Sequence, residues 1–243
     1  MPCFSVANRL IVFLISRYHH LKRQVAEGRF RIIAVFDTSA IEITNRFTHF
    51  VIFAATEETE LQFIIVDLEA TCWENVRSYN RMEIIEIGAV RLCSPDGEPI
   101  DEFSEFIKPV AEPTLSEFCS SLTTIKQSDV DSAPIFPIVF HRFLEWIGSE
   151  PYFLCSWGGY DKTQFNVDCD RHDVEFPNEF NNHINLKKEF ARTFSVKSCG
   201  MKRALSIAEI SQSGTHHRGI DDARNIAKLA KLILPGLSEL NGE

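Results

Sequence analysis

The segment FIIVDLEATCWE, residues 63–74, constrains this chain more than any other stretch. Its opening apolar run predicts a β-strand buried on both faces, yet Asp67 and Glu69 follow at the end of that strand. Because alternate side chains of a strand share a face, the two carboxylates should point to the same side, roughly 6–7 Å apart. Two acids in such a place repel each other and lose hydration, which raises their pKa and lowers stability.

A divalent cation between Asp67 and Glu69 would remove that repulsion, and carboxylate oxygens are ligands that suit Mg²⁺ or Mn²⁺. The plain alternative is a strand end with two solvated acids, which an isolated Asp-x-Glu pair does not exclude. The metal-site hypothesis therefore needs support from other parts of the chain.

Apolar patterns and turn signals predict one α/β domain over residues 61–236, followed by a tail over 237–243. Runs typical of strands lie at 61–70, 82–93, 100–109 and 151–158. Patterns typical of helices lie at 134–148, 161–173, 197–210 and 221–234. The turn at 94–99 should join the second and third strands as a hairpin, and Pro235 with Gly236 should end the last helix. This order favours a mixed central sheet of about five strands flanked by helices.

The formal net charge of −9 argues against a protein that coats nucleic acid without specificity. The charge is uneven along the chain, however. Residues 61–150 hold 6 Lys and Arg against 16 Asp and Glu, whereas residues 151–234 hold 12 against 10. One surface can therefore be acidic while another tolerates phosphates.

Residues 1–60 carry no recognisable motif and form an N-terminal extension whose structure the sequence does not indicate. Apolar stretches that fit short strands or a helix lie at 9–16, 31–36 and 48–55. Three interpretations stay open for this extension: a small accessory subdomain, a disordered arm, or residues added by a wrongly assigned start codon.

Cysteine use and hydropathy favour a cytoplasmic protein. The seven cysteines are irregularly spaced and include no Cys-x-x-Cys, which is typical of reduced thiols and gives no zinc ligand set. The apolar run at 10–16 is short and lacks a convincing cleavage site after it, so we expect no signal peptide. No run approaches the roughly 18–20 apolar residues that span a bilayer, so no membrane association is expected.

A second carboxylate, Asp161, stands in the segment SWGGYDKTQF, residues 156–165. The two glycines and the change from strand to helix place Asp161 at the mouth of the predicted sheet. An aspartate in the first turn of a helix is also favourable by itself, because it interacts with unpaired backbone N–H groups, and this alternative stays open.

The segment HHRGIDDARNIAKLA, residues 216–230, offers two competing pairs, His216 with Asp221 or His217 with Asp222. The helix that follows favours the second pair, because Asp222 lies on its apolar side while Asp221 shares a face with Asn225, which should point outward. On this hypothesis Asp221 is a helix cap and His216 a surface loop residue. The apolar stripe of the helix consists of Ala223, Ile226, Ala227, Ala230 and Ile233.

These motifs in this order resemble those of the DEDDh 3′–5′ exonucleases, which belong to the RNase H-like superfamily. Asp67 and Glu69 match the first motif of that family, Asp161 the second, and His217 with Asp222 the third. The resemblance implies an RNase H-like three-layer fold and catalytic roles for all five residues.

The resemblance covers about residues 62–235 and is strongest to the branch that contains the histone-mRNA and small-RNA 3′ exonucleases and their bacterial relatives. It is carried by the segments DLEATCWE, EIIEIGAV, LSEFCSSLTTIKQSDVDSAPIFP, SWGGYDKTQF and HRGIDDARNIAKLA. One departure is Thr124, which stands where the family usually has glycine, close to where the end of the substrate should lie.

The resemblance implies a metal-dependent 3′–5′ exonuclease that hydrolyses single-stranded nucleic acid, RNA rather than DNA, to nucleoside 5′-monophosphates. Two divalent cations, Mg²⁺ or Mn²⁺, would straddle the scissile phosphate, with Asp67, Glu69 and Asp222 as direct ligands. Asp161 would bind a cation directly or through water, and His217 would be the general base. No protein partner can be inferred.

The substrate end should be held by residues next to the motifs, since single strands are gripped by stacking and backbone contacts. The candidates for these contacts are Thr71, Cys72, Trp73 and Tyr160. For Trp73 and Tyr160, packing at the edge of the core is the alternative. Basic residues that could hold the incoming strand, or could simply lie on a solvated helix surface, are Lys187, Lys188, Arg192, Lys197, Lys202 and Arg203.

Two rival functions remain. One is a phosphodiesterase or short-oligoribonucleotide nuclease on the same fold, which would have the same site residues. The other is a catalytically silent module that binds RNA ends or a protein, although such a module has no physical reason to keep four mutually repelling carboxylates.

Overall fold

The computed structural model describes residues 31–35, 40–44, 49–53, 61–76 and 78–238, and the chain divides into two units, 1–59 and 60–243. In the first unit the described residues form an antiparallel sheet of three strands: β1 (Arg31–Val35), β2 (Ala40–Thr44) and β3 (His49–Phe53). Two of the apolar stretches noted above thus contain strands. The third, at 9–16, and the predicted absence of a signal peptide concern residues outside the described ones.

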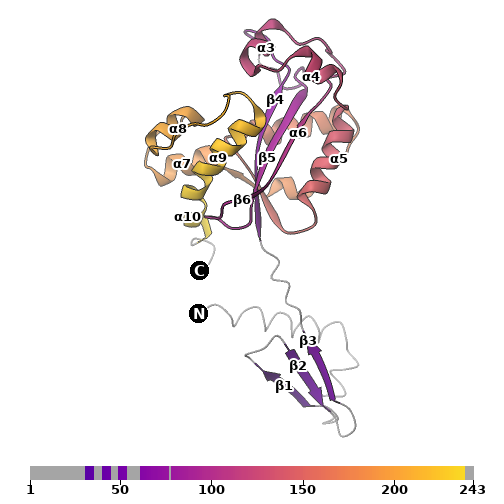
Figure 1. Ribbon diagram of the computed structural model, residues 1–243, viewed down its shortest axis with the longest axis vertical. Helices are drawn as coiled ribbons and strands as arrows, with labels where there is room; N and C mark the ends of the chain where they lie inside the picture. The colour runs from indigo at the N-terminus through magenta and orange to yellow at the C-terminus, as the bar shows by residue number, and fades with distance from the viewer. Residues whose placement is uncertain (1–30, 36–39, 45–48, 54–60, 77, 239–243) are drawn as a thin grey trace. The chain divides into compact units, whose positions relative to one another are not determined.

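The second unit is built on a mixed sheet with the strand order β6-β5-β4-β7-β8 (Figure 1). The antiparallel part consists of β4 (Gln62–Ala70), β5 (Ile84–Leu92) and β6 (Pro99–Phe106). The parallel part adds β7 (Tyr152–Ser156) beside β4 and β8 (His183–Asn185) beside β7. The prediction of a mixed sheet of about five strands is confirmed, as is the hairpin of β5 and β6.

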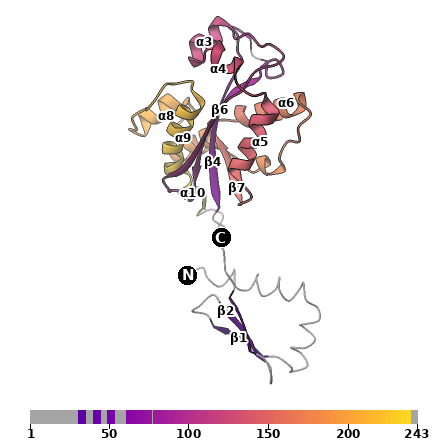
Figure 2. The same cartoon turned by 45° about the vertical axis from the view of Figure 1, so that its right-hand side comes forward.

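Helices cover both faces of this sheet (Figure 2). One face carries α7 (Leu186–Thr193), α8 (Met201–Ile207) and α9 (Gly219–Ile233). The other face carries α5 (Phe136–Ile147) and α6 (Tyr160–Arg171). Shorter elements are α3 (Glu117–Thr123), α4 (Gln127–Asp131), a 3₁₀ turn (Asn178–Asn181) and α10 (Pro235–Ser238). The four predicted helices are present, and the short α10 begins at Pro235; of the tail expected at 237–243, only residues 237–238 are among the described ones.

Strand β4 lies in the middle of the sheet, and its side chains point alternately into two hydrophobic cores. Phe63 and Ile65 pack into the cluster under α7, α8 and α9, whereas Ile64, Val66 and Leu68 pack into the cluster under α5 and α6. These five side chains are 5% exposed or less. Because residues two apart share a face, the strand delivers its next odd-numbered residues to the side that α9 covers.

Helix α3 ends at Thr124, which has φ 62 and ψ 4 and donates its N–H to the Ser120 carbonyl. This left-handed conformation closes many helices and favours glycine, since a Cβ is crowded there. The glycine that the resembling family usually has at this position therefore has a backbone reason, and Thr124 adopts the same turn with a β-branched side chain.

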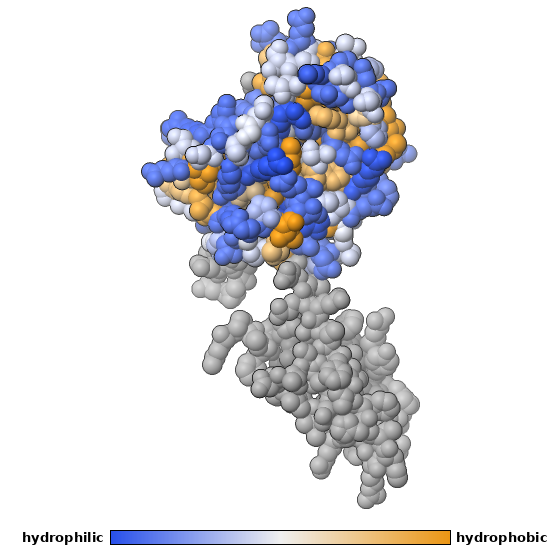
Figure 3. Space-filling view, in the orientation of Figure 1, coloured by the Kyte–Doolittle hydropathy of each residue, from blue (hydrophilic) through white to orange (hydrophobic). Residues whose placement is uncertain are grey.

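On the face of the second unit that Figure 3 shows, hydrophobic residues lie among hydrophilic ones. Within the described part of the chain, no helix is both long enough and apolar enough to cross a bilayer.

Candidate active site

Asp67 and Glu69 lie at the end of β4, on the side of the sheet that faces α9. Their carboxylate oxygens and that of Asp222 lie within 4.8 Å of one another. Burial and the surrounding acids raise the pKa of Asp67 and of Glu69 well above the ordinary values. No hydrogen bond or ion pair from the described residues reaches either carboxylate, so nothing in this part of the protein compensates their charge.

Asp161 opens helix α6 just after β7 and is 4% exposed. Its Oδ1 accepts a hydrogen bond of 3.1 Å from the backbone N–H of Leu68, which ties the start of α6 to β4. Burial raises the pKa of Asp161 to about 6, against the opposing effect of this bond and of Ser156. Asp161 lies outside the group of oxygens within 4.8 Å, but its charge acts on Asp67, so it occupies a neighbouring position.

Asp222 stands in the first turn of α9 and is also 4% exposed. Its Oδ2 accepts hydrogen bonds from the backbone N–H of His217, at 3.0 Å, and from Nδ1 of His216, at 2.8 Å. Two contacts differ from expectation. His216 is not a free surface residue, because it lies against Asp222, and Asn225 does not point outward, because it is buried and bonded to the 211–215 loop.

Asp221 points away from this group. It accepts a hydrogen bond of 2.8 Å from the backbone N–H of Thr215 and an ion pair from Arg224. Asp221 therefore braces the loop before α9, while the adjacent Asp222 belongs to the acidic group.

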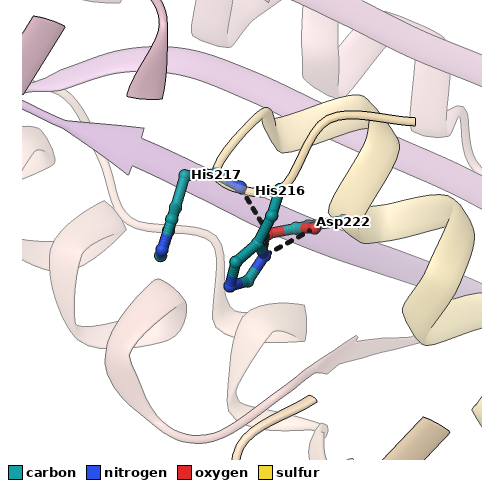
Figure 4. Close-up of side chains that lie close together, drawn as sticks. All are labelled: His216, His217 and Asp222. Carbon is teal, nitrogen blue, oxygen red and sulfur yellow. Dashed lines mark hydrogen bonds and ion pairs between the residues drawn. The ribbon is translucent and has the colours of Figure 1, made fainter. Parts of the chain in front are cut away.

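His217 is half-buried beside Asp222 and has φ 62 (Figure 4). Burial, followed by the neighbouring His216, lowers the pKa of His217 below its ordinary value. This shift favours the neutral ring, which has a lone pair with which to accept a proton.

The predicted site residues surround a cavity of about 460 Å³. Asp67, Glu69, Asp161, His217 and Asp222 all line it. Further lining residues are Leu68, Ala70, Cys72, Met82, Leu122, Trp157, Tyr160, Gly200, Met201, Lys202, His216 and Ile226. The set joins the end of β4 with the starts of α6, α8 and α9, so four parts of the chain meet at one opening.

Of the four residues predicted to hold substrate, Cys72 and Tyr160 line the cavity and Thr71 and Trp73 do not. Thr71 is 1% exposed, and its hydroxyl accepts a hydrogen bond of 2.9 Å from the Glu83 N–H. Trp73 stacks under the guanidinium of Arg81, 3.9 Å from the ring centroid. Both side chains thus make structural contacts: Thr71 joins the segment after β4 to the residue before β5, and Trp73 packs against Arg81.

One of the six basic candidates, Lys202, lines the cavity. The other five lie on α7, on α8 or in the segment between these helices, away from the lining. A basic residue at the cavity is consistent with a phosphate-bearing ligand.

Sequence reasoning missed a further buried acid beside the site, Glu86, which lies opposite Glu69 on β5 and is 1% exposed. Unlike Glu69, it accepts hydrogen bonds from Arg218 and from the N–H of Gly219 at the start of α9. The alternation of β5 would have placed Glu86 on the same side as the site, although nothing local indicated its partner.

The donor set fits divalent cations. Asp67 is partly buried and Glu69 is buried. Neither carboxylate receives a hydrogen bond from the described residues, and both lie beside two further carboxylates. Oxygen-only ligands of this kind suit hard divalent ions, and bound positive charge would remove the repulsion that raises each pKa.

Fold and site together define an RNase H-like domain with a four-carboxylate centre and an adjacent histidine. The family model described as Exonuclease matches residues 64–230. The chain is 35% identical over 196 residues to ERI1 exoribonuclease 2 of Mus musculus, which covers 71% of this chain and 28% of that protein. It is 32% identical over 185 residues to 3′-5′ exoribonuclease 1 of Rattus norvegicus, covering 72% of this chain and 54% of that protein.

A solved structure, the nuclease domain of 3′hExo bound to rAMP and described as a DEDDh family member, superposes with a TM-score of 0.68 at 30% identity. The match covers 72% of this chain and 92% of that one. The chain therefore belongs to the DEDDh 3′–5′ exonuclease family, whose members generally use divalent metal ions. It spans only 28% and 54% of the two curated relatives named above.

Proposed function

We propose that this protein is a metal-dependent 3′–5′ exonuclease that removes nucleoside 5′-monophosphates from single-stranded RNA. The observation that carries the proposal is the convergence of Asp67, Glu69, Asp161 and Asp222 on one open cavity, with His217 beside them. Two of these acids lack any compensating donor among the described residues, which is a costly arrangement unless cations are bound there.

In this proposal each acid has a distinct task. Asp67, Glu69 and Asp222 are direct ligands, and Asp161, held by the Leu68 N–H, binds directly or through water. When bound, Mg²⁺ or Mn²⁺ supplies the charge that acidifies the attacking water and stabilises the leaving 3′-oxygen.

His217 acts as the general base. Its neutral ring opens on the cavity, and its backbone N–H is held by Asp222, so the imidazole is positioned next to the acids. A base with a pKa near or somewhat below 7 can take a proton from water at physiological pH.

The substrate end is held by Cys72 and Tyr160 at the cavity wall, and Lys202 offers a charge for a backbone phosphate. The ring of Tyr160 already contacts that of Tyr79, with centroids 5.5 Å apart, so the wall is aromatic where a base could stack. For Thr71 and Trp73 we propose an indirect role, because they position the segment that carries Cys72.

RNA is favoured over DNA because the curated relatives are named exoribonucleases and the matched nuclease domain was solved with rAMP. We further propose that the nuclease unit comprises residues 61–236 and acts in the cytoplasm. The described cysteines are all free thiols, in keeping with a reducing compartment.

A time course on a 5′-labelled single-stranded RNA and its DNA counterpart tests this function. The parent and Asp67→Ala are compared in Mg²⁺, in Mn²⁺ and in EDTA. We expect a ladder that shortens from the 3′ end of RNA faster than of DNA, only with metal and only in the parent. Binding of RNA by the folded parent without cleavage in either metal would instead support the silent binding module.

A further inference from the structure

The loop before α9 and the first turn of that helix bring together three possible metal ligands, of which the proposed chemistry uses only two. His216, His217 and Asp222 each offer one ligand atom, and these atoms lie within 4.8 Å of one another. Only His217 and Asp222 have a task in the proposed hydrolysis, which leaves the imidazole of His216 unexplained.

The backbone arranges the two histidines unusually. In extended chain, successive side chains point to opposite sides. Here His217 has φ 62, and the two rings lie side by side, with centroids 3.9 Å apart and planes inclined by 31° (Figure 4). Left-handed backbone is costly for a residue other than glycine and clusters at functional sites.

His216 is held in place without an ion. Its Nδ1 lies 2.8 Å from Oδ2 and 3.1 Å from Oδ1 of Asp222, and because a carboxylate can only accept, Nδ1 is the donor. The side chain is 27% exposed and lines the cavity, as does His217, so an ion from solvent can reach both rings.

The chemistry of this trio differs from that of the acids on β4. Two imidazoles, one carboxylate and an open position for water form the donor set that Zn²⁺ takes in many proteins. Oxygen-only groups such as Asp67 and Glu69 suit Mg²⁺ or Mn²⁺ instead, and imidazole ligands shift the preference toward Zn²⁺, Cu²⁺ or Ni²⁺.

We propose that His216, His217 and Asp222 bind a borderline transition-metal ion, Zn²⁺ in particular, and that this ion inhibits the enzyme. The inhibition rests on the proposed function, because Zn²⁺ would occupy the lone pair with which His217 accepts a proton. Zn²⁺ would also bind Asp222, which could then no longer serve the divalent ion held by Asp67 and Glu69. The same loop thus serves catalysis when the rings are free and blocks it when they hold the ion.

The test is a titration of metal-free protein with Zn²⁺ alone, in competition with a chromogenic chelator and without nucleic acid. His216→Asn is the informative variant, since an asparagine amide can still donate to Asp222 but brings no imidazole lone pair. His141→Asn is the matched control, because His141 is 74% exposed on α5 and remote in sequence from the loop.

We expect His216→Asn to bind Zn²⁺ at least about 10-fold more weakly than the parent, since even residues behind a ligand change affinity by about 10- to 100-fold. His141→Asn should match the parent. Equal Zn²⁺ affinity in the parent and His216→Asn would overturn the proposal. His216→Gln repeats the test, and melting curves show that each variant is folded.

A second titration adds Zn²⁺ to the nuclease reaction in excess Mg²⁺. The half-inhibitory Zn²⁺ concentration should rise by about 10-fold or more in His216→Asn, in proportion to its loss of affinity. An unchanged value would show that inhibition arises elsewhere. If the parent binds Zn²⁺ through His216 but cleaves nothing, the proposed function fails while the metal site stands.

Discussion

Thr124 has a left-handed backbone conformation that its β-branched side chain disfavours. The residue closes α3 with φ 62, near Leu122, which lines the active-site cavity. Left-handed backbone costs roughly 1–2 kcal/mol for residues with a Cβ, and a branched side chain makes the fit worse. The turn is therefore kept by the structure around it rather than by threonine itself.

Thr124→Gly should stabilise the protein by about 1 kcal/mol, because relief of the left-handed strain exceeds the added entropy of the unfolded chain. Urea unfolding measures the change. Ser132→Gly is the control, since Ser132 ends α4 with φ −89 and gains nothing from glycine. A loss of stability in Thr124→Gly would show that the threonine side chain, not the backbone, holds the turn.

Helix α9 can place Asp222 beside β4 because it crosses the sheet at very close range over Gly88. A Cβ at Gly88 would lie 2.0 Å from backbone atoms of Gly219 and Ile220. Glu86, two residues earlier on the same strand, accepts hydrogen bonds from Arg218 and Gly219. The absence of a side chain at Gly88 thus lets α9 approach β5 closely, and the buried carboxylate of Glu86 holds the start of the helix.

Gly88→Ala should therefore destabilise the fold by roughly 3 kcal/mol or more, since backbone rather than a flexible side chain must move. It should also weaken metal binding, because α9 carries Asp222. Thermal unfolding with and without Mn²⁺ reports both effects. Gly159→Ala is the matched control, as nothing lies within 4 Å of a Cβ there. Similar melting temperatures for the two variants would contradict the close contact.

Elements whose own residues carry an apolar pattern were predictable, and those made by their neighbours were not. β4 and α5 are long and strongly patterned, so their type and bounds followed closely from sequence. β8 has three half-buried residues and exists because it pairs with β7, which no local pattern indicates. Helices α3, α4 and α7, of eight residues or fewer, give little periodic signal, and α8 was predicted over 197–210 although it has only seven residues.

The same distinction holds within the site. The placement of Asp67 and Glu69 follows from alternation along one strand, and that of Asp222 from the apolar face of α9. The position of His216 could not be predicted, because it depends on the positive φ of His217, and nothing in the local sequence indicates that angle. Asn225 was misjudged for a related reason: the 211–215 loop folds back over it.

Across the whole molecule, the acidic cluster links stability to pH and to metal. Burial and the charges of Asp161 and Glu69 raise the pKa of Asp67 above its ordinary value of 3.8. The folded state then binds this proton more tightly than the unfolded state does. Stability is greatest below the unfolded pKa and falls as pH rises toward the folded pKa.

In EDTA, Asp67→Asn should therefore be more stable than the parent, by an amount that grows as pH rises above the ordinary carboxyl pKa of 3.8. Urea unfolding across pH measures it, and added Mn²⁺ should reverse the order because only the parent keeps the ligand. Parallel pH profiles for parent and variant in EDTA would refute this linkage; Asp96→Asn, in an exposed turn, should follow the parent.

Two adjacent acids, Asp221 and Asp222, allow the assignment of the metal site to be tested. Asp222 belongs to the carboxylate cluster, whereas Asp221 bonds Thr215 and Arg224 outside it. The measurement is the rate at which 5′-labelled RNA shortens from its 3′ end in Mg²⁺. Asp222→Asn should lower this rate by more than about 100-fold, which exceeds the loss typical of residues that only support a metal ligand. Asp221→Asn should lower it far less. Equal losses, or a larger loss in Asp221→Asn, would contradict the assignment of the metal site.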